Sequence, residues 1–304
     1  MPFADHVIEA PDGHKIAARL ALPEGTPRGL VQVLHGLAEH GERYARFADA
    51  LTGAGWAVVN HDHRGHGKSA ASEADLGHFA DHDGWRRVIE DVRVVRAFAR
   101  EQVPDGELVL FGHSMGTFVS LTEQIDAPGS IDKLVLSGGN CGGGLLVSAG
   151  LRIAKLERFR QGPRGRSNLI EKMSFGSFND AFKPVRTESD WLSRDPDEVD
   201  KYVADPKCGF QGTNQLWVDL IGALIELGKH ERLARLPPDL PIYMFCGDAD
   251  PVSQGGAGVR KLGDQLRRAG VRNVKVKVYP GGRHESLNET HRDAVTQDVL
   301  GWIG

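Results

Sequence analysis

The sequence is poor in cysteine and has no long apolar run. Its three cysteines, Cys141, Cys208 and Cys246, are too few and too scattered for a framework of disulfide bonds. Unpaired cysteines suit a reducing compartment, so we expect a cytoplasmic protein. No stretch approaches the roughly 20 apolar residues of a membrane-spanning helix. The N-terminus shows neither the basic nor the apolar segment of a secretion signal.

Positive charge is not in excess either. The 37 Lys and Arg residues against 41 Asp and Glu give a formal net charge of −4, so there is no electrostatic reason to expect nucleic acid as a partner. Basic residues do gather between Arg152 and Arg166. We interpret this run as a solvated helix face, with contact to an anionic lipid head group as the alternative.

Short apolar runs alternate with helical patterns in the first part of the chain. Two strand-like segments, Asp5–Glu9 and Lys15–Leu22, flank the turn signal Pro11-Asp12-Gly13 and predict a hairpin. Beyond them we predict strands at Leu30–Leu34, Trp56–Asn60, Leu108–Phe111 and Leu134–Leu136, and helices at Tyr44–Ala54, Trp85–Arg100 and after Ser114. This alternation is typical of an α/β fold, a mostly parallel sheet with helices on both faces.

The alternation stops at about Cys141 and resumes after Leu236. The segment between them has no clean strand but has helical patterns, Asn214–Leu227 among them. After it we predict strands at Ile242–Cys246 and Val274–Tyr279, and helices at Val259–Arg268 and ending at Ile303. We therefore expect one α/β core, residues 1–140 and 237–304, interrupted by a helical insertion at residues 141–236.

The strongest motif is Gly112-His113-Ser114-Met115-Gly116, a match to G-x-S-x-G between an apolar strand and a helical pattern. The serine of this motif lies in a strained strand-to-helix turn that lifts its hydroxyl out of the sheet. The two glycines leave room for the neighbouring backbone. We predict Ser114 to be a nucleophile.

An attacking serine also needs two backbone N–H groups that stabilise the oxyanion. The residue after the nucleophile, Met115, is expected to supply one, and the loop after an earlier strand supplies the other. The strand ending at Leu34 leads into His35-Gly36-Leu37. Since Gly36 lets the backbone approach a substrate, we predict Leu37 as the second donor.

A serine hydroxyl requires a base, and the imidazole of that base requires a carboxylate partner. The expected chain order is serine, acid, histidine. Strand Ile242–Cys246 is followed by Asp248 and Asp250, and the next strand is followed by Gly281-Gly282 and then His284. Sites of open α/β sheets lie beyond the carboxyl ends of strands, so we predict His284 as base and Asp250 as its partner. Asp248 is expected to support the turn.

Several histidines lie close together between His61 and Ser69. Their spacing fits no structural zinc pattern, and no cysteine joins them. We expect a turn with several glycines there and no metal site.

Together these residues resemble the monoacylglycerol lipase and lysophospholipase group of α/β-hydrolases, also called serine aminopeptidase-like hydrolases. The matching segments are His35-Gly36, Glu39-His40, Arg43-Tyr44, Asp62 to Ser69, Gly112 to Gly116, Gly247 to Asp250, and His284. The resemblance implies an eight-stranded sheet, a helical cap formed by the insertion, no cofactor, and Asp250 as the triad acid. This chain departs from the group in its largely charged cap.

We therefore predict a serine hydrolase that cleaves a carboxylic ester through an acyl-enzyme. The expected substrates are monoacylglycerols, lysophospholipids or short- to medium-chain esters, and the charged cap favours a short acyl pocket. Hydrolysis of a thioester, amide or C–C bond is one alternative, and a non-catalytic ligand-binding protein is another. Transient contact of the cap with lipid stays open. The expected substrate-binding residues are Gly36, Leu216, Trp217 and Leu220.

Overall fold

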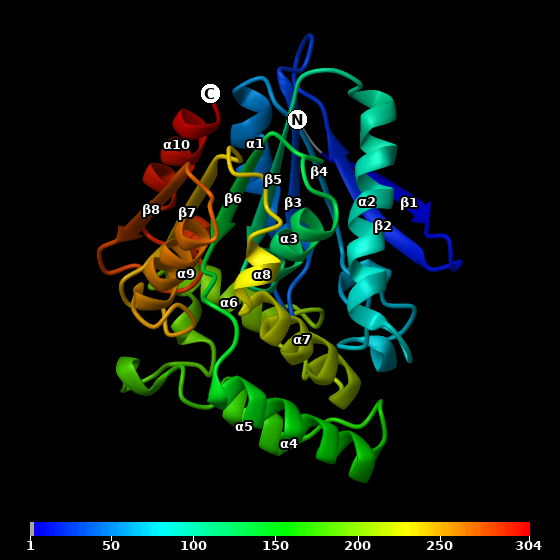
Figure 1. Ribbon diagram of the computed structural model, residues 1–304, viewed down its shortest axis with the longest axis vertical. Helices are drawn as coiled ribbons and strands as arrows, with labels where there is room; N and C mark the ends of the chain where they lie inside the picture. The colour runs from blue at the N-terminus through cyan, green and yellow to red at the C-terminus, as the bar shows by residue number, and fades with distance from the viewer. Residues whose placement is uncertain (1–2) are drawn as a thin grey trace.

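The computed structural model describes residues 3–304 and is built around one eight-stranded sheet (Figure 1). The strands are β1 Ala4–Glu9, β2 Lys15–Ala21, β3 Gly29–Leu34, β4 Ala57–His61, β5 Glu107–His113, β6 Lys133–Ser137, β7 Ile242–Gly247 and β8 Val274–Tyr279. Their order across the sheet is β1-β2-β4-β3-β5-β6-β7-β8. Neighbours from β4 to β8 are parallel, whereas β2 is antiparallel to β1 and β4. The predicted α/β-hydrolase fold with a mostly parallel eight-stranded sheet is confirmed.

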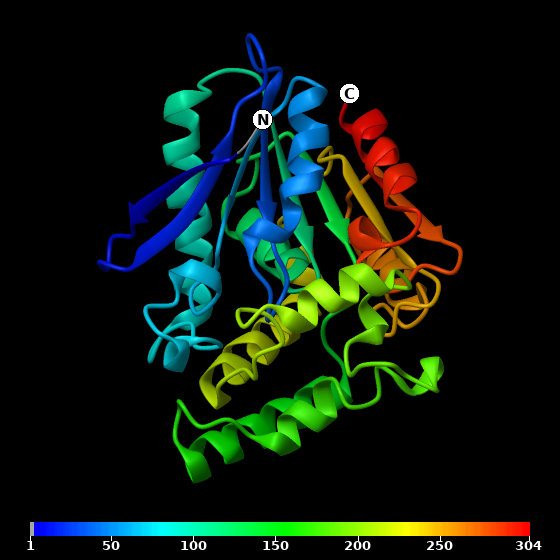
Figure 2. The same cartoon turned by 180° about the vertical axis from the view of Figure 1, so that it is seen from behind.

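Helices cover both faces of the sheet, so the central strands are buried on both sides. In β3, Leu30 and Leu34 belong to one hydrophobic cluster, and Val31 and Val33 belong to the other, as the period of two in a strand requires. One face carries α2 Gly84–Gln102, α3 Met115–Asp126 and α9 Ala257–Arg268, and the opposite face carries α1 Ala45–Gly53 and α10 Arg292–Ile303 (Figures 1 and 2).

Between β6 and β7 the chain is helical. It forms α4 Leu145–Gln161, α5 Asn168–Ser174, α6 Pro196–Ala204, α7 Asn214–Leu227 and α8 His230–Leu233, with short 3₁₀ turns η4 Asp180–Phe182 and η5 Asp190–Leu192. Helices α4, α5 and α7 lie beyond the carboxyl ends of the central strands (Figures 1 and 2). Helix α7 packs on α2 and α3, and α4 packs on α7. This segment therefore lies over the edge of the sheet at which β5 ends.

The predicted elements differ from the observed ones mainly at their ends. Strand β5 continues past Phe111 to His113 because Gly112 and His113 pair with β6. The helix expected from Tyr44 begins at Ala45, after a separate 3₁₀ turn, η1 Gly41–Tyr44. The remaining 3₁₀ turns are η2 Gly67–Ser69, η3 Glu73–Asp75 and η6 Ser286–Asn288. In residues 3–304 none of the helices has the length and apolar character needed to cross a bilayer.

Candidate active site

Ser114 lies in the tight turn between β5 and α3. Its backbone has φ 51° and ψ −117°, outside the regions that L-residues favour. A Cβ atom on Gly112 would come 2.3 Å from the Gly116 carbonyl oxygen, and one on Gly116 would come 2.2 Å from the Leu34 carbonyl oxygen. The two glycines therefore allow the close packing that holds Ser114 in a strained conformation. Its side chain is partly exposed, although the flanking residues are buried.

His284 and Asp250 form a buried pair. His284 Nδ1 lies 2.9 Å from Asp250 Oδ1, and the Val252 N–H donates to the same oxygen at 2.9 Å. Asp248 is exposed and accepts a hydrogen bond of 2.6 Å from the Gly281 N–H. The structure thus brings the imidazole to Asp250, while Asp248 holds the loop that leads to His284.

The surroundings of His284 favour its protonated form. Burial lowers the pKa of His284, but the carboxylates of Asp250, Glu285 and Glu39 together raise it by more, so this pKa lies above the ordinary 6.5. The ring of His113 lies 4.8 Å from that of His284. Burial lowers the pKa of His113 to about 4, so His113 is uncharged at neutral pH and does not oppose a charge on His284.

The loop after β3 lies against the serine. A Cβ atom on Gly36 would stand 3.2 Å from Ser114 Cβ, so a side chain here would crowd the nucleophile. The Gly36 N–H donates to Glu39 Oε1 at 2.6 Å, so this N–H is already used, and the next amide in the loop is that of Leu37, the predicted donor. Met115 is the first residue of α3, where an N–H has no intrahelical acceptor. Leu37, Met115 and Ser114 line one cavity.

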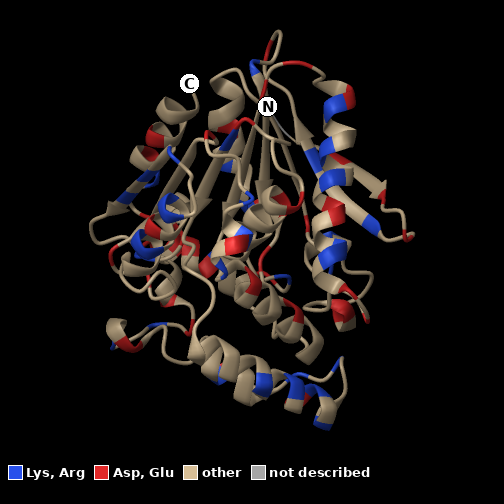
Figure 3. Cartoon of the chain, viewed as in Figure 1, with Lys and Arg blue, Asp and Glu red and all other residues tan. Residues whose placement is uncertain are grey.

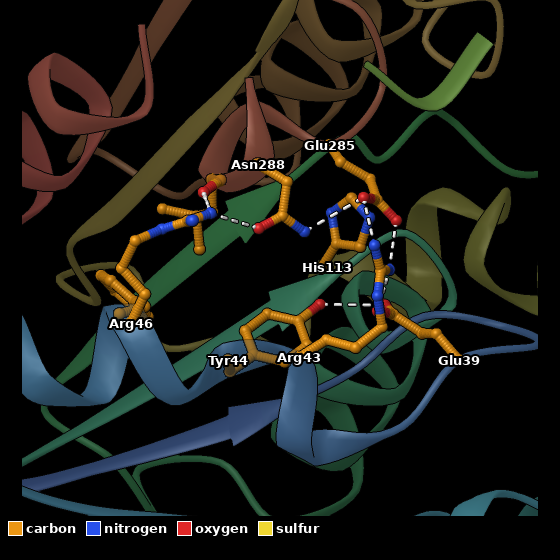
Figure 4. A pocket seen from close by; sticks show the side chains of 9 residues that line it. Glu39, Arg43, Tyr44, Arg46, His113, Glu285 and Asn288 are labelled. Carbon is orange, nitrogen blue, oxygen red and sulfur yellow. Dashed lines mark hydrogen bonds and ion pairs between the residues drawn. The ribbon is translucent and has the colours of Figure 1, made fainter. Parts of the chain in front are cut away.

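Arg43 links the loop after β3 to the loop of His284 (Figure 4). Its guanidinium donates to Glu39 Oε2 at 2.8 Å and binds both carboxylate oxygens of Glu285, at 2.7 Å to Oε2. Burial lowers the pKa of Arg43 and raises that of Glu285, but their mutual attraction outweighs burial and keeps both charged. The sequence motifs contained Glu39 and Arg43, but no role was predicted for either residue, and Glu285 was not considered. The only sequence signal for this network was the i,i+4 spacing of Glu39 and Arg43.

A cavity of about 630 Å³ opens beside Ser114, between the sheet and the helical insertion. The predicted substrate-binding residues Gly36, Trp217 and Leu220 line it. Leu216 does not line it, because its side chain is fully buried in the hydrophobic core. Sequence reasoning missed most of the aromatic and aliphatic wall, which includes Phe118, Phe175, Phe178, Trp191 and Leu224.

The histidine-rich segment His61–Ser69 packs beneath the loop after β3. His35 Nδ1 lies 2.7 Å from the Gly36 carbonyl oxygen, and the His63 N–H donates to His35 Nε2 at 2.9 Å. The Asp62 carboxylate accepts from Arg19 at 2.8 Å and from two backbone N–H groups. These contacts hold the loop that carries Gly36 in position.

The sequence matches a protein family described as "Serine aminopeptidase, S33" over residues 25–291. It is 32% identical to the monoacylglycerol lipase of Mycolicibacterium smegmatis, over 99% of this chain and 96% of that protein. It is 29% identical to the monoglyceride lipase of Homo sapiens, over 100% of this chain and 91% of that protein.

Among solved structures, the chain is similar to a highly thermostable carboxyl esterase from Bacillus coagulans in complex with glycerol. The TM-score is 0.91 at 30% identity, covering 100% of this chain and 98% of that one. A monoglyceride lipase from Saccharomyces cerevisiae, a soluble variant, shares the fold with a TM-score of 0.76 at 19% identity, covering 100% of this chain and 94% of that one. The resemblance to the monoacylglycerol lipase group is confirmed. The chain therefore belongs to the serine aminopeptidase, S33, family and is a serine hydrolase with the α/β-hydrolase fold.

Proposed function

We propose that this enzyme hydrolyses the ester bond of monoacylglycerols and releases a fatty acid and glycerol. Ester hydrolysis itself is supported by the family and by the relatives. The observation that carries the choice of substrate is the wall of the cavity beside Ser114, which contains many aromatic and aliphatic side chains and is poor in basic groups. The names of the two similar lipases also support a monoacylglycerol as substrate.

We propose the following chemistry, which the position of His284 beside Asp250 supports. Ser114 Oγ attacks the ester carbonyl carbon while His284 Nε2 accepts its proton, and Asp250 orients the imidazole through Nδ1. The N–H groups of Leu37 and Met115 bind the oxyanion. The ester C–O bond then breaks, His284 donates its proton to the leaving glycerol oxygen, and the acyl group stays on Ser114. Water, deprotonated by His284, then attacks the acyl carbonyl carbon. The bond to Ser114 Oγ breaks, His284 returns the proton to Oγ, and the fatty acid is released.

The cavity accepts a single acyl chain. Its apolar wall includes Phe175, Trp217, Leu220 and Leu224, and each buried methylene contributes about 0.8 kcal/mol. A cavity of about 630 Å³ lies within the usual range of small-molecule sites, about 300–1,000 Å³, which suits glycerol with one acyl chain. This is larger than the short pocket expected from the charged cap.

A neutral head group suits the cavity better than a phosphate. Lys172 is the only Lys or Arg among its described lining residues, and Glu171 and Glu188 lie in the same wall. No arginine there can give a phosphate the bidentate contact that it binds most strongly. Monoacylglycerols should therefore be preferred over lysophospholipids.

Residues 141–236 act as a cap that takes substrate from a lipid surface. On α4, the side chains of Leu145, Leu146 and Phe159 are 91%, 89% and 90% exposed, and Arg152 and Lys155 are exposed beside them. Figure 3 shows this helix at the outer edge of the molecule, with basic residues towards its C-terminal end. On a lipid surface, these exposed apolar side chains would enter the lipid, and the basic residues among them would contact anionic head groups. The three free cysteines support work in the cytoplasm.

The test compares substrates under one set of conditions. Monoolein should be cleaved with kcat/KM at least about tenfold above lysophosphatidylcholine, and triolein should be a poor substrate. Ser114→Ala should lower kcat by roughly 10⁴–10⁶ and abolish labelling by a fluorophosphonate probe, with the circular dichroism spectrum unchanged. A preference for lysophosphatidylcholine would contradict the substrate, and labelling of folded Ser114→Ala would contradict the nucleophile.

A further inference from the structure

His40, Asp205 and Cys208 bring three metal-binding atoms together where the cap meets the core. Their donor atoms all lie within 4.8 Å of one another, and no other three His, Cys, Asp or Glu residues of the described chain do so. His40 follows β3, whereas Asp205 and Cys208 lie in the turn after α6. Because 165 residues separate His40 from Asp205, no motif in the sequence indicates the cluster.

The local hydrogen bonds hold these side chains in place. His40 is buried, and its Nε2 lies 2.8 Å from Asp205 Oδ2. The other carboxylate oxygen, Oδ1, accepts from the Lys207 N–H at 2.8 Å, and the Cys208 N–H donates to the Asp205 carbonyl oxygen at 3.0 Å. On the far side of the ring, His40 Nδ1 lies 4.0 Å from Glu42 Oε2. That distance is too long for a hydrogen bond, so Glu42 adds negative charge beside the ring but does not fix its tautomer.

The charges around the cluster tolerate a cation. The Arg43 guanidinium interacts electrostatically with Cys208. Two carboxylates, those of Glu39 and Glu285, bind this guanidinium and offset its positive charge. Lys207 is the other nearby cation, and it interacts electrostatically with Asp205.

We infer that His40, Asp205 and Cys208 form a zinc site that fastens the cap to the core. Imidazole nitrogen, carboxylate oxygen and thiolate sulfur all bind Zn²⁺, at about 2.0–2.3 Å, and three protein ligands leave the fourth tetrahedral position to water. Such bonds place the donor atoms roughly 3.3–3.7 Å apart. His40 Nε2 and Asp205 Oδ2, 2.8 Å apart, need to separate by about half an ångström. The metal replaces the Cys208 thiol proton, which goes to the buffer.

The site lies beside the loop that carries Leu37. The carbonyl oxygen of Ala38 accepts hydrogen bonds from the Tyr202 hydroxyl at 3.0 Å and from the Gly209 N–H at 2.9 Å. Residues 202 and 209 bracket the two cap ligands, so bound zinc holds this turn of the cap against the loop. An effect on turnover rests on the proposed function, because it passes through the Leu37 N–H. Metal binding does not rest on it and is measured separately.

Calorimetric titration of chelator-treated protein with ZnCl₂ should show one site per chain. Co²⁺ in place of Zn²⁺ should produce a sulfur-to-metal charge-transfer absorption band. Zn²⁺ should also slow the reaction of Cys208 with a thiol reagent at least about tenfold and leave Cys141, the other half-buried free cysteine of the cap, unchanged. Mass spectrometry of the labelled peptides distinguishes the two cysteines.

Four variants locate the metal. His40→Ala and Cys208→Ser should each weaken Zn²⁺ binding by more than about 100-fold, beyond the loss that an outer partner causes. Cys141→Ser should bind as the wild type does, and so should His284→Gln, which excludes binding at the triad. Unchanged affinity in folded His40→Ala or Cys208→Ser, or no protection of Cys208 in the wild type, would overturn the site. None of these measurements needs a substrate, so a failed monoolein assay would leave their result intact.

Discussion

The indole ring of Trp191, in η5 of the cap, packs against the imidazole of His284, with ring centroids 5.1 Å apart and planes at 35°. The backbone joins the same two segments, since the His284 N–H donates to the Trp191 carbonyl oxygen at 3.4 Å and the Glu285 N–H donates to that of Leu192 at 2.8 Å. Phe178 packs on Trp191 at 4.9 Å. The cap is therefore in direct contact with the candidate base.

Trp191→Leu should lower the pKa of His284 and slow turnover. An aromatic ring stabilises a nearby cation by about 0.5–2 kcal/mol, or roughly 0.4–1.5 pKa units. Its loss should move the acidic limb of kcat/KM to lower pH and reduce kcat roughly ten- to hundredfold through poorer positioning. Trp191→Phe keeps an aromatic ring and should shift the limb less. An acidic limb that stays at the wild-type pH in Trp191→Leu would contradict this role.

The wild-type kcat/KM should rise with pH through one ionisation above 6.5. Only neutral His284 can accept the serine proton, and neighbouring carboxylates, that of Asp250 above all, raise the pKa of His284 above 6.5. Asp250→Asn should lower that pKa and reduce kcat by about 10³–10⁴. Asp248→Asn should reduce kcat less than about tenfold, because its carboxylate contacts only the loop backbone. Rate profiles of the three proteins test this, and the opposite ranking would make Asp248 the partner of His284.

The fold should lose stability in acid because of the buried histidines beneath the loop after β3. Burial lowers the pKa of His61 and His66 to about 4, and lowers those of His35 and His63 well below 6.5. The unfolded chain therefore binds protons first, and stability declines as the pH falls from 6.5 towards 4.

At pH 5 the free energy of unfolding should be lower by about 2 kcal/mol for each of His61 and His66. Urea unfolding at about pH 7.5 and pH 5 measures the free energy of unfolding at each pH. The difference between the two values should be smaller in His66→Gln than in the wild type. Equal free energies of unfolding of the wild type at both pH values would be inconsistent with neutral buried histidines.

Leu220 and Leu216, one turn apart on α7, should respond differently to substitution. Leu220 lines the cavity, so Leu220→Arg should reduce kcat/KM on long-chain p-nitrophenyl esters at least about tenfold, and less on the acetate. Leu216 is buried in the core, so Leu216→Ala should lower the free energy of unfolding by about 2–5 kcal/mol and leave the chain-length preference unchanged. Equal losses on all esters for Leu220→Arg would argue against a role in acyl binding.

Features that depend on local sequence were predictable. The strand-to-helix turn at Ser114 needs small residues two positions away, and these are visible in the sequence as Gly112 and Gly116. Strand β8, Val274–Tyr279, and helix α7, Asn214–Leu227, were predicted with their observed bounds. Helix α7 begins where the Thr213 hydroxyl accepts a hydrogen bond from the Leu216 N–H, a cap that acts over a few residues.

Contacts between the cap and the core were not predictable. Trp191 reaches His284, and His40 reaches Asp205, only after the cap has docked on the sheet. Helical periodicity also placed Leu216 with Leu220, since residues four apart share a face. Helix α7 is covered by α2, α3 and α4, so it is buried on more than one side. Helical periodicity shows which residues share a face of a helix, but it does not show which other elements pack against that face.

The chain order of the candidate triad sets the moment at which activity can arise during folding. Ser114 directly follows β5 in the middle of the sheet, whereas Asp250 and His284 follow β7 and β8, the last two strands at one edge. A chain in which those strands have not yet joined lacks both the base and the carboxylate at the serine. Such a chain is harmless to ester-containing lipids. The rate at which turnover returns after dilution from denaturant therefore reports when β7 and β8 join the sheet. Ellipticity, which averages over all helices, would not detect this step.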